Sequence, residues 1–259
     1  MRDAWNVARG VWWRQAHLFF TNPSFLLPSL LFPLFFFTAF VGGLSRISEI
    51  PGFDFPLGYT AFQFVFVLLQ SAAFSGVFTG FGIARDIQTG FLNRLALTPV
   101  RGIVLLFGQL GGLLAIALVQ AVFYLVVGVA FGVRLETGFG GAALLLVLKA
   151  VIALAFASFG CWAALRTGST EAVQGLFPVF FVFLFLSSMN IPRNLIETTW
   201  FRWVTTINPV SYLIEAVRAL VIYDWRWETV GLGFAVAGVM SVIGFALATH
   251  ALIRRMERT

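Results

Sequence analysis

The sequence predicts an all-α integral membrane protein, with six transmembrane helices, an interfacial amphipathic helix before them, and re-entrant helices between the fifth and sixth spans. Hydrophobic residues make up 59% of the 259 residues and charged residues only 11%, whereas soluble proteins carry about 25% charged residues. With a mean hydropathy of +0.92, the apolar side chains exceed what a core of this size could enclose. Most of them must therefore face lipid, in a single transmembrane domain over residues 1–259.

The first predicted element is an amphipathic helix over residues 1–21. On a helical wheel Trp5 and Trp12 lie on an apolar half that contains only one strongly polar residue, Gln15, while Arg9 lies on the polar half. Tryptophans on one side and arginines on the other are typical of a helix that lies in the membrane interface. The same segment lacks the continuous apolar stretch and the cleavage site of a signal peptide, so none is predicted.

The six predicted spans form a bundle over residues 24–252, because a helix needs about 20 mainly apolar residues to cross the hydrocarbon core. Runs of this kind occur at 24–44, 59–82, 103–132, 140–164, 172–189 and 229–252. Residues 205–223 are also apolar, but Glu215 and Arg218 interrupt them. This segment therefore predicts a helix that enters the membrane from one surface and does not cross it.

The arginines predict which side each loop faces, since cytoplasmic loops carry an excess of positive residues. With the amino terminus in the cytoplasm, the cytoplasmic side holds Arg2, Arg9, Arg14, Arg85, Arg94, Arg101, Arg166, Arg254, Arg255 and Arg258. The other side then holds only Arg46, Arg134, Arg193, Arg202, Arg218 and Arg226. We therefore predict a multi-pass protein of the cell (inner or plasma) membrane with both termini in the cytoplasm.

Several function classes are disfavoured by what the sequence lacks. It has no G-x-x-x-x-G-K-[ST] loop to hold nucleotide phosphates, so we predict no ATP hydrolysis by this chain and no catalytic residues. Its cations lie in short segments between apolar runs, which argues against a nucleic-acid-binding surface. Cys161 is the only cysteine, and His17 and His250 lie far apart, so neither a metal site nor a bound cofactor is predicted.

Lys149 is the only lysine, and it lies within the predicted fourth span. Charged groups inside a membrane are costly and often mark a path for substrate or ions. Lys149 either extends its ammonium group to the outer headgroups or contributes to a substrate path, and we favour the first interpretation. No Asp or Glu falls inside any predicted span, which disfavours a proton-coupled carrier.

Two polar motifs stand out between the apolar runs. The first lies between the second and third spans and comprises Arg85, Asp86, Gly90, Phe91, Arg94, Leu95, Pro99 and Arg101. A short helix can begin near Gly90 and must end before Pro99. Phe91 and Leu95 share one face of that helix, and the arginines supply charge. A short, rigid helix of this kind at the cytoplasmic surface suits contact with a soluble partner.

The second motif precedes the last span and comprises Asn208, Pro209, Tyr212, Glu215 and Arg218. Pro209 suits the first turn of a helix, because a residue there has no intrahelical partner for its N–H group. Glu215 and Arg218 are three residues apart and can pair on one face. We assign this motif to the re-entrant segment on the outer side.

Together these features resemble the permease subunits of the ABC-2 type exporter family, and the resemblance covers essentially the whole chain. The order of the amphipathic helix, the spans, the G-F-x-x-R-L-x-x-x-P loop and the N-P-x-x-Y-x-x-E-x-x-R segment is similar to that of daunorubicin and other drug-resistance permeases. The resemblance implies a half-transporter that pairs with a second copy or a homologous permease. It further implies separate P-loop ATPase subunits, which bind ATP and Mg²⁺ and contact the loop and the amino-terminal helix.

The resemblance implies export of an amphiphilic drug-like, lipid or lipid-linked substrate across the cell membrane. Two alternatives stay open: a membrane scaffold or assembly protein without a transport path, and a proton-coupled carrier. Co-purification with a P-loop ATPase encoded beside this chain would separate an exporter permease from a scaffold.

Overall fold

The computed structural model describes residues 2–49, 51, 57–91, 102–189, 193–223 and 225–257. The chain is 88% helical, and the described ranges contain no β-strand, which confirms the all-α prediction. The elements are α1 (Arg2–Thr21), α2 (Pro23–Leu44), η1 (Ser45–Glu49), α3 (Gly58–Gln88), α5 (Gly102–Ala130), α6 (Gly138–Thr167), α7 (Thr170–Gln174), α8 (Leu176–Phe185), η2 (Arg193–Leu195), α9 (Thr199–Ile207), α10 (Pro209–Val221) and α11 (Trp227–Met256).

Helix α3 is the centre of the bundle. In its most apolar 18-residue window 89% of the residues are buried, compared with 17% in the window of α2 and 22% in that of α11. Glycines bring α3 against α6. A Cβ atom on Gly76 would lie 2.5 Å from the Ala157 backbone nitrogen, and one on Gly80 would lie 2.7 Å from the Gly160 carbonyl oxygen. Small residues at this spacing allow two membrane helices to approach closely.

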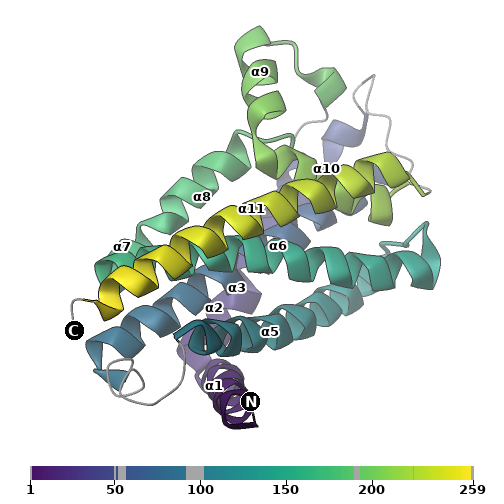
Figure 1. Cartoon of the computed structure of the whole chain (residues 1–259). Coiled ribbons are helices and arrows are strands. Elements are labelled where there is room, and N and C mark those ends of the chain that lie inside the picture. Colours follow the sequence, from purple (N-terminus) through teal and green to yellow (C-terminus); the bar gives the residue numbers. More distant parts are fainter. Residues whose placement is uncertain are drawn as a thin grey trace.

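The bundle has two distinct ends (Figure 1). At the loop end, where α3 and α6 finish, Gly168 lies close to the side chains of Ile87 and Arg255. At the opposite end, the far end, the Thr137 hydroxyl at the start of α6 donates a hydrogen bond to the Leu220 carbonyl in α10. Helices α3, α6 and α11 therefore run from the far end to the loop end. Helices α2 and α5 run in the opposite direction.

Five helices are long and apolar enough to cross a membrane, as predicted, in the segments Pro23–Glu49, Gly58–Gln88, Leu106–Ala130, Gly138–Thr167 and Trp227–Arg255. The predicted span at 172–189 is not one continuous helix, because α7 ends at Gln174 and α8 reaches only Phe185. Pro178 explains the interruption, since it has no N–H group to donate to the Gln174 carbonyl. The predicted re-entrant region contains two short helices, α9 and α10.

Candidate functional site

An arginine on α1 joins three helices at the loop end. The Arg14 guanidinium donates two hydrogen bonds to the Asp86 carboxylate, at 2.9 and 2.6 Å, and Gln109 on α5 donates a third at 3.1 Å. Asp86 is buried in the last turns of α3. Its hydrogen bond with Arg14 raises the pKa of the guanidinium, against the opposing effect of burial. Bidentate pairs of this kind fix orientation as well as adding energy, so α1, α3 and α5 are held together here.

The first residues of the loop motif at 85–101 join the same cluster. Gly90 ends α3 with φ +68°, a conformation that glycine adopts at little steric cost. The half-buried Phe91 ring then lies 4.1 Å below the guanidinium carbon of Arg14. Arg85 is exposed. The other predicted members, Arg94, Leu95, Pro99 and Arg101, lie outside the described residues.

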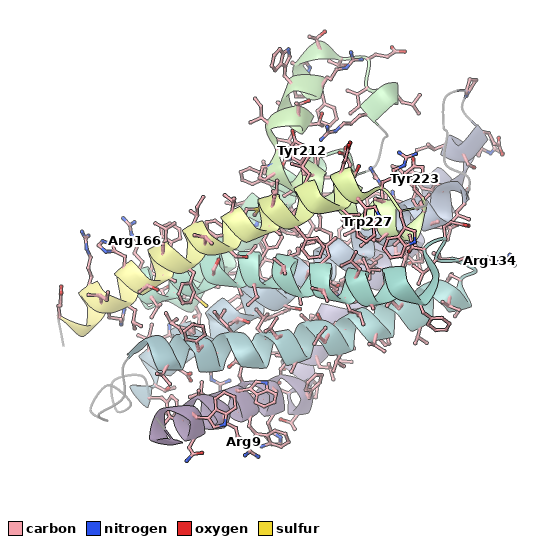
Figure 2. The ribbon with its side chains drawn as sticks, turned by 45° about the vertical axis from the view of Figure 1, so that its right-hand side comes forward. Arg9, Arg134, Arg166, Tyr212, Tyr223 and Trp227 are labelled. Carbon is pink, nitrogen blue, oxygen red and sulfur yellow. The ribbon has the colours of Figure 1, made fainter. Side chains whose placement is uncertain are left out.

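Helix α1 packs against glycines of α5 and α3, Gly108, Gly112 and Gly82, which we call the glycine seat. A Cβ atom on Gly108 would lie 2.8 Å from Cβ of Val11, and one on Gly112 would lie 2.6 Å from Cβ of Gln15. Gly82 on α3 faces the amide of the same glutamine. The one strongly polar residue on the apolar half of α1 is therefore packed between two membrane helices, while Arg9 points away from the bundle (Figure 2).

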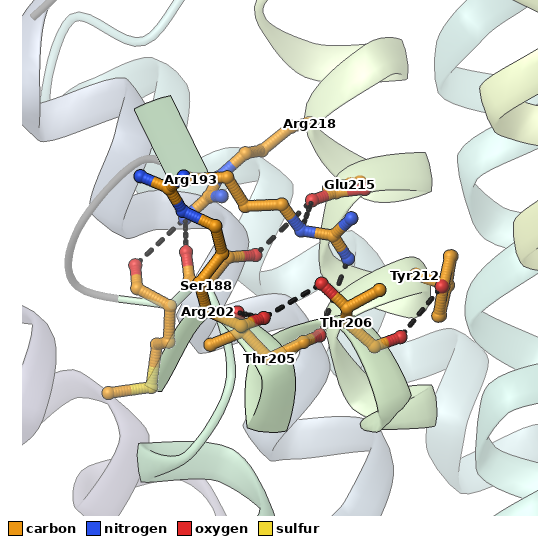
Figure 3. A network of polar contacts seen from close by, with 9 residues as sticks. Ser188, Arg193, Arg202, Thr205, Thr206, Tyr212, Glu215 and Arg218 are labelled. Atoms are coloured by element: carbon orange, nitrogen blue, oxygen red, sulfur yellow. Dashed lines mark hydrogen bonds and ion pairs between the residues drawn. The ribbon is translucent and has the colours of Figure 1, made fainter. Parts of the chain in front are cut away.

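At the far end Arg218 holds the chain that follows α8. Its guanidinium donates hydrogen bonds to the carbonyls of Ser188 and Met189, at 2.7 and 2.8 Å, and lies 3.8 Å from the ring centroid of Phe62 on α3. Arg218 is only 4% exposed. Figure 3 shows this arginine in a network that links α10 to Ser188, Met189, Arg193 and α9.

Glu215 forms its ion pair with Arg193 of η2, at 2.7 Å. Burial raises the pKa of the Glu215 carboxyl, and the charge of Arg193 opposes that shift. The Arg193 guanidinium also lies 5.1 Å from the Tyr212 ring, and the Tyr212 hydroxyl donates to the Thr206 carbonyl at 2.7 Å. These contacts connect η2, α9 and α10 into one unit (Figure 3).

Asn208 and Pro209 begin α10 as the motif predicts. The Asn208 side-chain oxygen accepts a hydrogen bond from the Val210 N–H at 2.9 Å, which satisfies one of the free donors of the helix start. The amide group of the same asparagine donates to the Phe183 carbonyl at 2.5 Å. The cap therefore also attaches α10 to α8.

Lys149 does not reach the membrane surface, so the interpretation that it extends to the outer headgroups is wrong. Its side chain is 2% exposed, and its Nζ atom has no hydrogen-bond partner in the part of the chain that the structure describes. It lies 5.2 Å from the ring centroid of Tyr124 on α5. Lys149 therefore lies on the inward face of α6, where neighbouring helices enclose its side chain.

A chain of hydrogen bonds lies beside Lys149 inside the bundle. The Thr79 hydroxyl donates to the Ser75 carbonyl at 3.0 Å, and the Ser75 hydroxyl donates to the Gln120 side chain at 2.5 Å. Gln120 in turn donates to the hydroxyl of Ser29 on α2 at 3.0 Å. The Tyr124 hydroxyl donates to the Ser29 carbonyl at 2.9 Å. Helices α2, α3 and α5 thus share one buried polar connection.

The sequence matches the ABC-2 type transporter family over residues 8–222, which includes the loop-end cluster and the far-end network. This chain belongs to the ABC-2 type transporter family. Members of that family are transport permeases, and the helices described above make this one a multi-pass membrane protein.

Similar proteins include proteins named as transport permeases and one named as a drug-resistance permease. The chain is 23% identical over 250 residues to the putative transport permease ycf38 of Porphyra purpurea, covering 91% of this chain and 85% of the relative. It is 27% identical over 205 residues to ycf38 of Pyropia yezoensis, covering 77% and 68%. It is 26% identical over 152 residues to the probable doxorubicin resistance ABC transporter permease protein DrrC of Mycobacterium tuberculosis, covering 59% and 55%.

Sequence reasoning missed several residues of this ABC-2 chain that the structure places in the two clusters. Arg14 and Gln109 complete the loop-end cluster, and Arg193 completes the far-end network. The sequence does indicate Gln15, because a lone glutamine on the apolar half of a helix predicts a specific packing position. Arg193 had no such signal, since no local pattern predicts that the short helix η2 packs against α10.

Proposed function

We propose that this chain is the permease subunit of an ATP-driven exporter that moves an amphiphilic drug-like, lipid or lipid-linked substrate out across the cell membrane. The observation that carries the proposal is the Arg14–Asp86 pair, which lies inside the family match and joins α1 to the end of α3. In this proposal ATP and Mg²⁺ bind to separate P-loop ATPase subunits that contact the loop at 85–101 and α1.

The loop-end cluster gives such an ATPase a mechanical connection to the bundle. Phe91 is half-buried against Arg14, so a partner that displaces the loop also displaces the guanidinium that holds Asp86. Because Gln109 bonds to the same carboxylate, the displacement reaches α5 as well as α1 and α3. In the proposal Arg94, Leu95, Pro99 and Arg101 complete the partner contact.

Six crossings with both termini in the cytoplasm remain part of the proposal. Support comes from the chain path, since α6 ends near Arg255 of α11, yet α10 finishes near Thr137 at the other end. Residues 170–208 therefore have to travel from the loop end to the far end. A short helix such as α8, continued by residues 186–189, would make that sixth crossing.

In the proposal the far-end network acts as an outer cap over the substrate path. Helix α10 with Asn208, Pro209, Tyr212, Glu215 and Arg218 would be re-entrant, and Lys149 would line the path below it. The exposed apolar side chains of α2, among them Leu31 and Phe35, would face lipid or a second permease copy.

The test is reconstitution of the permease with the P-loop ATPase encoded beside it, followed by measurement of complex yield, ATP turnover and export. Phe91→Ala should weaken the ATPase contact by about 2 kcal/mol, as loss of a buried anchor does. Arg94→Glu should weaken it in a salt-dependent way. Normal assembly and transport with both variants would overturn the coupling model.

Absence of any ATPase complex from the wild type would instead favour the scaffold alternative. Transport that follows a proton gradient without ATP would favour the proton-coupled carrier.

Topology is tested separately, with single cysteines at Ser48 and Asn194 in a Cys161→Ala background. In the proposed orientation, an impermeant thiol reagent labels both cysteines in intact cells. Labelling of either cysteine only after lysis would overturn the proposed orientation.

A further inference from the structure

A cavity of about 250 Å³ lies at the loop end, beneath the last turns of α1 and beside the start of α2. Its walls include Phe19 of α1, Phe25 of α2, and Phe78 of α3. The three rings pack edge to face, with the Phe78 centroid 6.3 Å from Phe19 and 5.9 Å from Phe25. The walls are thus preformed and mainly apolar.

The inner end of the cavity carries two hydroxyl groups, but neither needs a ligand. Thr79 donates to the Ser75 carbonyl and Ser75 donates to Gln120, so both hydroxyl protons are already used within the protein. Recognition of a polar scaffold needs precisely placed free donors or acceptors. These two groups offer no free donor, and beside Gln15 the walls carry the apolar side chains Leu18, Phe19, Phe25, Phe78 and Ile116. The interior therefore suits a hydrocarbon chain better than a polar ring system.

The mouth of the cavity carries a net positive charge. Arg14 is neutralised by Asp86, but Arg85 is exposed and has no ion pair within the described ranges. Helix α1 lies at the membrane surface in the proposed topology, so Arg85 lies at the level of the lipid headgroups. A basic residue at that depth attracts anionic headgroups.

We propose that this cavity is a binding site for a membrane phospholipid with an anionic headgroup, drawn from the leaflet at the loop end. One acyl chain lies between Phe19, Phe25 and Phe78, and the headgroup phosphate contacts Arg85. The cavity is slightly below the roughly 300–1,000 Å³ that pockets for drug-sized ligands occupy. It therefore admits part of one chain and leaves the second chain in the bilayer.

Lipid binding here does not depend on the exporter proposal, since it needs neither ATPase nor substrate. It adds a bound molecule that contacts α1, α2 and α3 beside the Arg14–Asp86 pair. A lipid that spans these three helices stabilises the docked position of α1, because it binds only while the three walls are together.

The test measures lipid retention by the purified full-length chain in detergent, after exchange from vesicles of phosphatidylglycerol and phosphatidylethanolamine with identical acyl chains. Native mass spectrometry should find one retained lipid per chain, with phosphatidylglycerol preferred. Arg85→Gln should reduce that preference about fivefold, the contribution of one basic residue at an anionic surface. Thr79→Phe, which fills the inner end, should remove the retained lipid of both kinds.

The matched control is Arg166→Gln. Arg166 is also an exposed arginine at the loop end, but it lies on α6, away from α1 (Figure 2), and should leave the preference unchanged. Equal loss of preference in Arg85→Gln and Arg166→Gln would overturn the site in favour of diffuse surface charge. Unchanged retention in a monodisperse Thr79→Phe protein would overturn the cavity as its location. If that variant does not fold, the comparison of the two arginine variants decides alone.

Discussion

The two ends of the bundle are each held by an arginine, but in different ways. At the loop end the Arg14 side chain is 35% exposed and pairs with one carboxylate, Asp86. At the far end Arg218 is 4% exposed and donates to two backbone carbonyls. The first contact joins a surface helix to the bundle, and the second fixes the backbone of a chain that lacks regular structure.

The difference indicates which end can rearrange. Water can replace Asp86 as a partner for the partly exposed Arg14 guanidinium, and the Asp86 carboxylate keeps its hydrogen bond from Gln109 when the pair opens. No such replacement exists for the carbonyls of Ser188 and Met189, because an unsatisfied buried polar group carries its full desolvation cost. We therefore expect the loop end to move when a partner binds and the far end to stay rigid. The following substitutions test this contrast.

The largest effect is expected from Arg218→Leu. Hydrogen bonds from charged groups contribute about 1.5–3 kcal/mol each. Losing the two that Arg218 donates to the Ser188 and Met189 carbonyls should therefore cost about 3 kcal/mol and lower the melting temperature in detergent by roughly 6–12 °C. The control is Arg226→Leu, which removes an exposed arginine that lies 3.9 Å from the Tyr223 ring. A drop in melting temperature of the same size in both variants would contradict the rigid far end.

A smaller effect is expected where α1 meets its glycine seat. Gly112→Ala places a methyl group 2.6 Å from Cβ of Gln15, and overpacking of this kind costs about 1–3 kcal/mol. Gly111→Ala is the matched control, since its methyl group would lie at an ordinary 3.5 Å from Trp12. Limited proteolysis should release α1 faster from Gly112→Ala only. Equal release from both variants would mean that the seat does not hold α1.

The Arg14–Asp86 pair should show a still smaller coupling. In a cycle of Arg14→Gln, Asp86→Asn and the double variant, we expect an interaction free energy of about 1.5 kcal/mol from thermal unfolding. ATP turnover of the reconstituted complex should fall more than this loss of stability explains, because the pair transmits movement. A cycle with no interaction term would leave α1 held by the glycine seat alone.

The sequence predicted five of the membrane helices because each carries a long apolar run that no soluble fold could bury. It also predicted the start of α10, since Asn208 and Pro209 act through local geometry. The segment at 172–189 is not one continuous helix, because Pro178 interrupts an otherwise apolar run, and its crossing of the membrane stays a prediction. An apolar composition therefore predicted membrane location there, but not the length of the helix.

The candidate site was less predictable because its members come from distant segments. Asp86 was identified within the loop motif, but its partners Arg14 and Gln109 lie on other helices, and no spacing rule connects them. The buried polar residues of α3 were missed for a related reason. Ser75 and Thr79 are small enough to leave an apolar run looking uniform, although they mark the face that packs against other helices.

The smallest effect on stability is expected from Lys149→Met, which removes a buried charged side chain from α6 without changing its volume much. The Tyr124 ring, 5.2 Å from Nζ, contributes about 2 kcal/mol at a desolvated site, which does not exceed the roughly 2.5–3.5 kcal/mol cost of holding an unpaired charge in the membrane. Replacement by methionine should therefore shift the melting temperature by less than the neighbouring control Leu148→Met does, or raise it. Volume-conserving changes at a buried position such as Leu148 usually cost less than about 1.5 kcal/mol.

If Lys149 lines the substrate path, export should fall in Lys149→Met while folding and ATPase assembly stay normal. Normal export with normal folding would remove Lys149 from the path, and a large loss of stability would mean that its ammonium group has a structural partner in the assembled transporter.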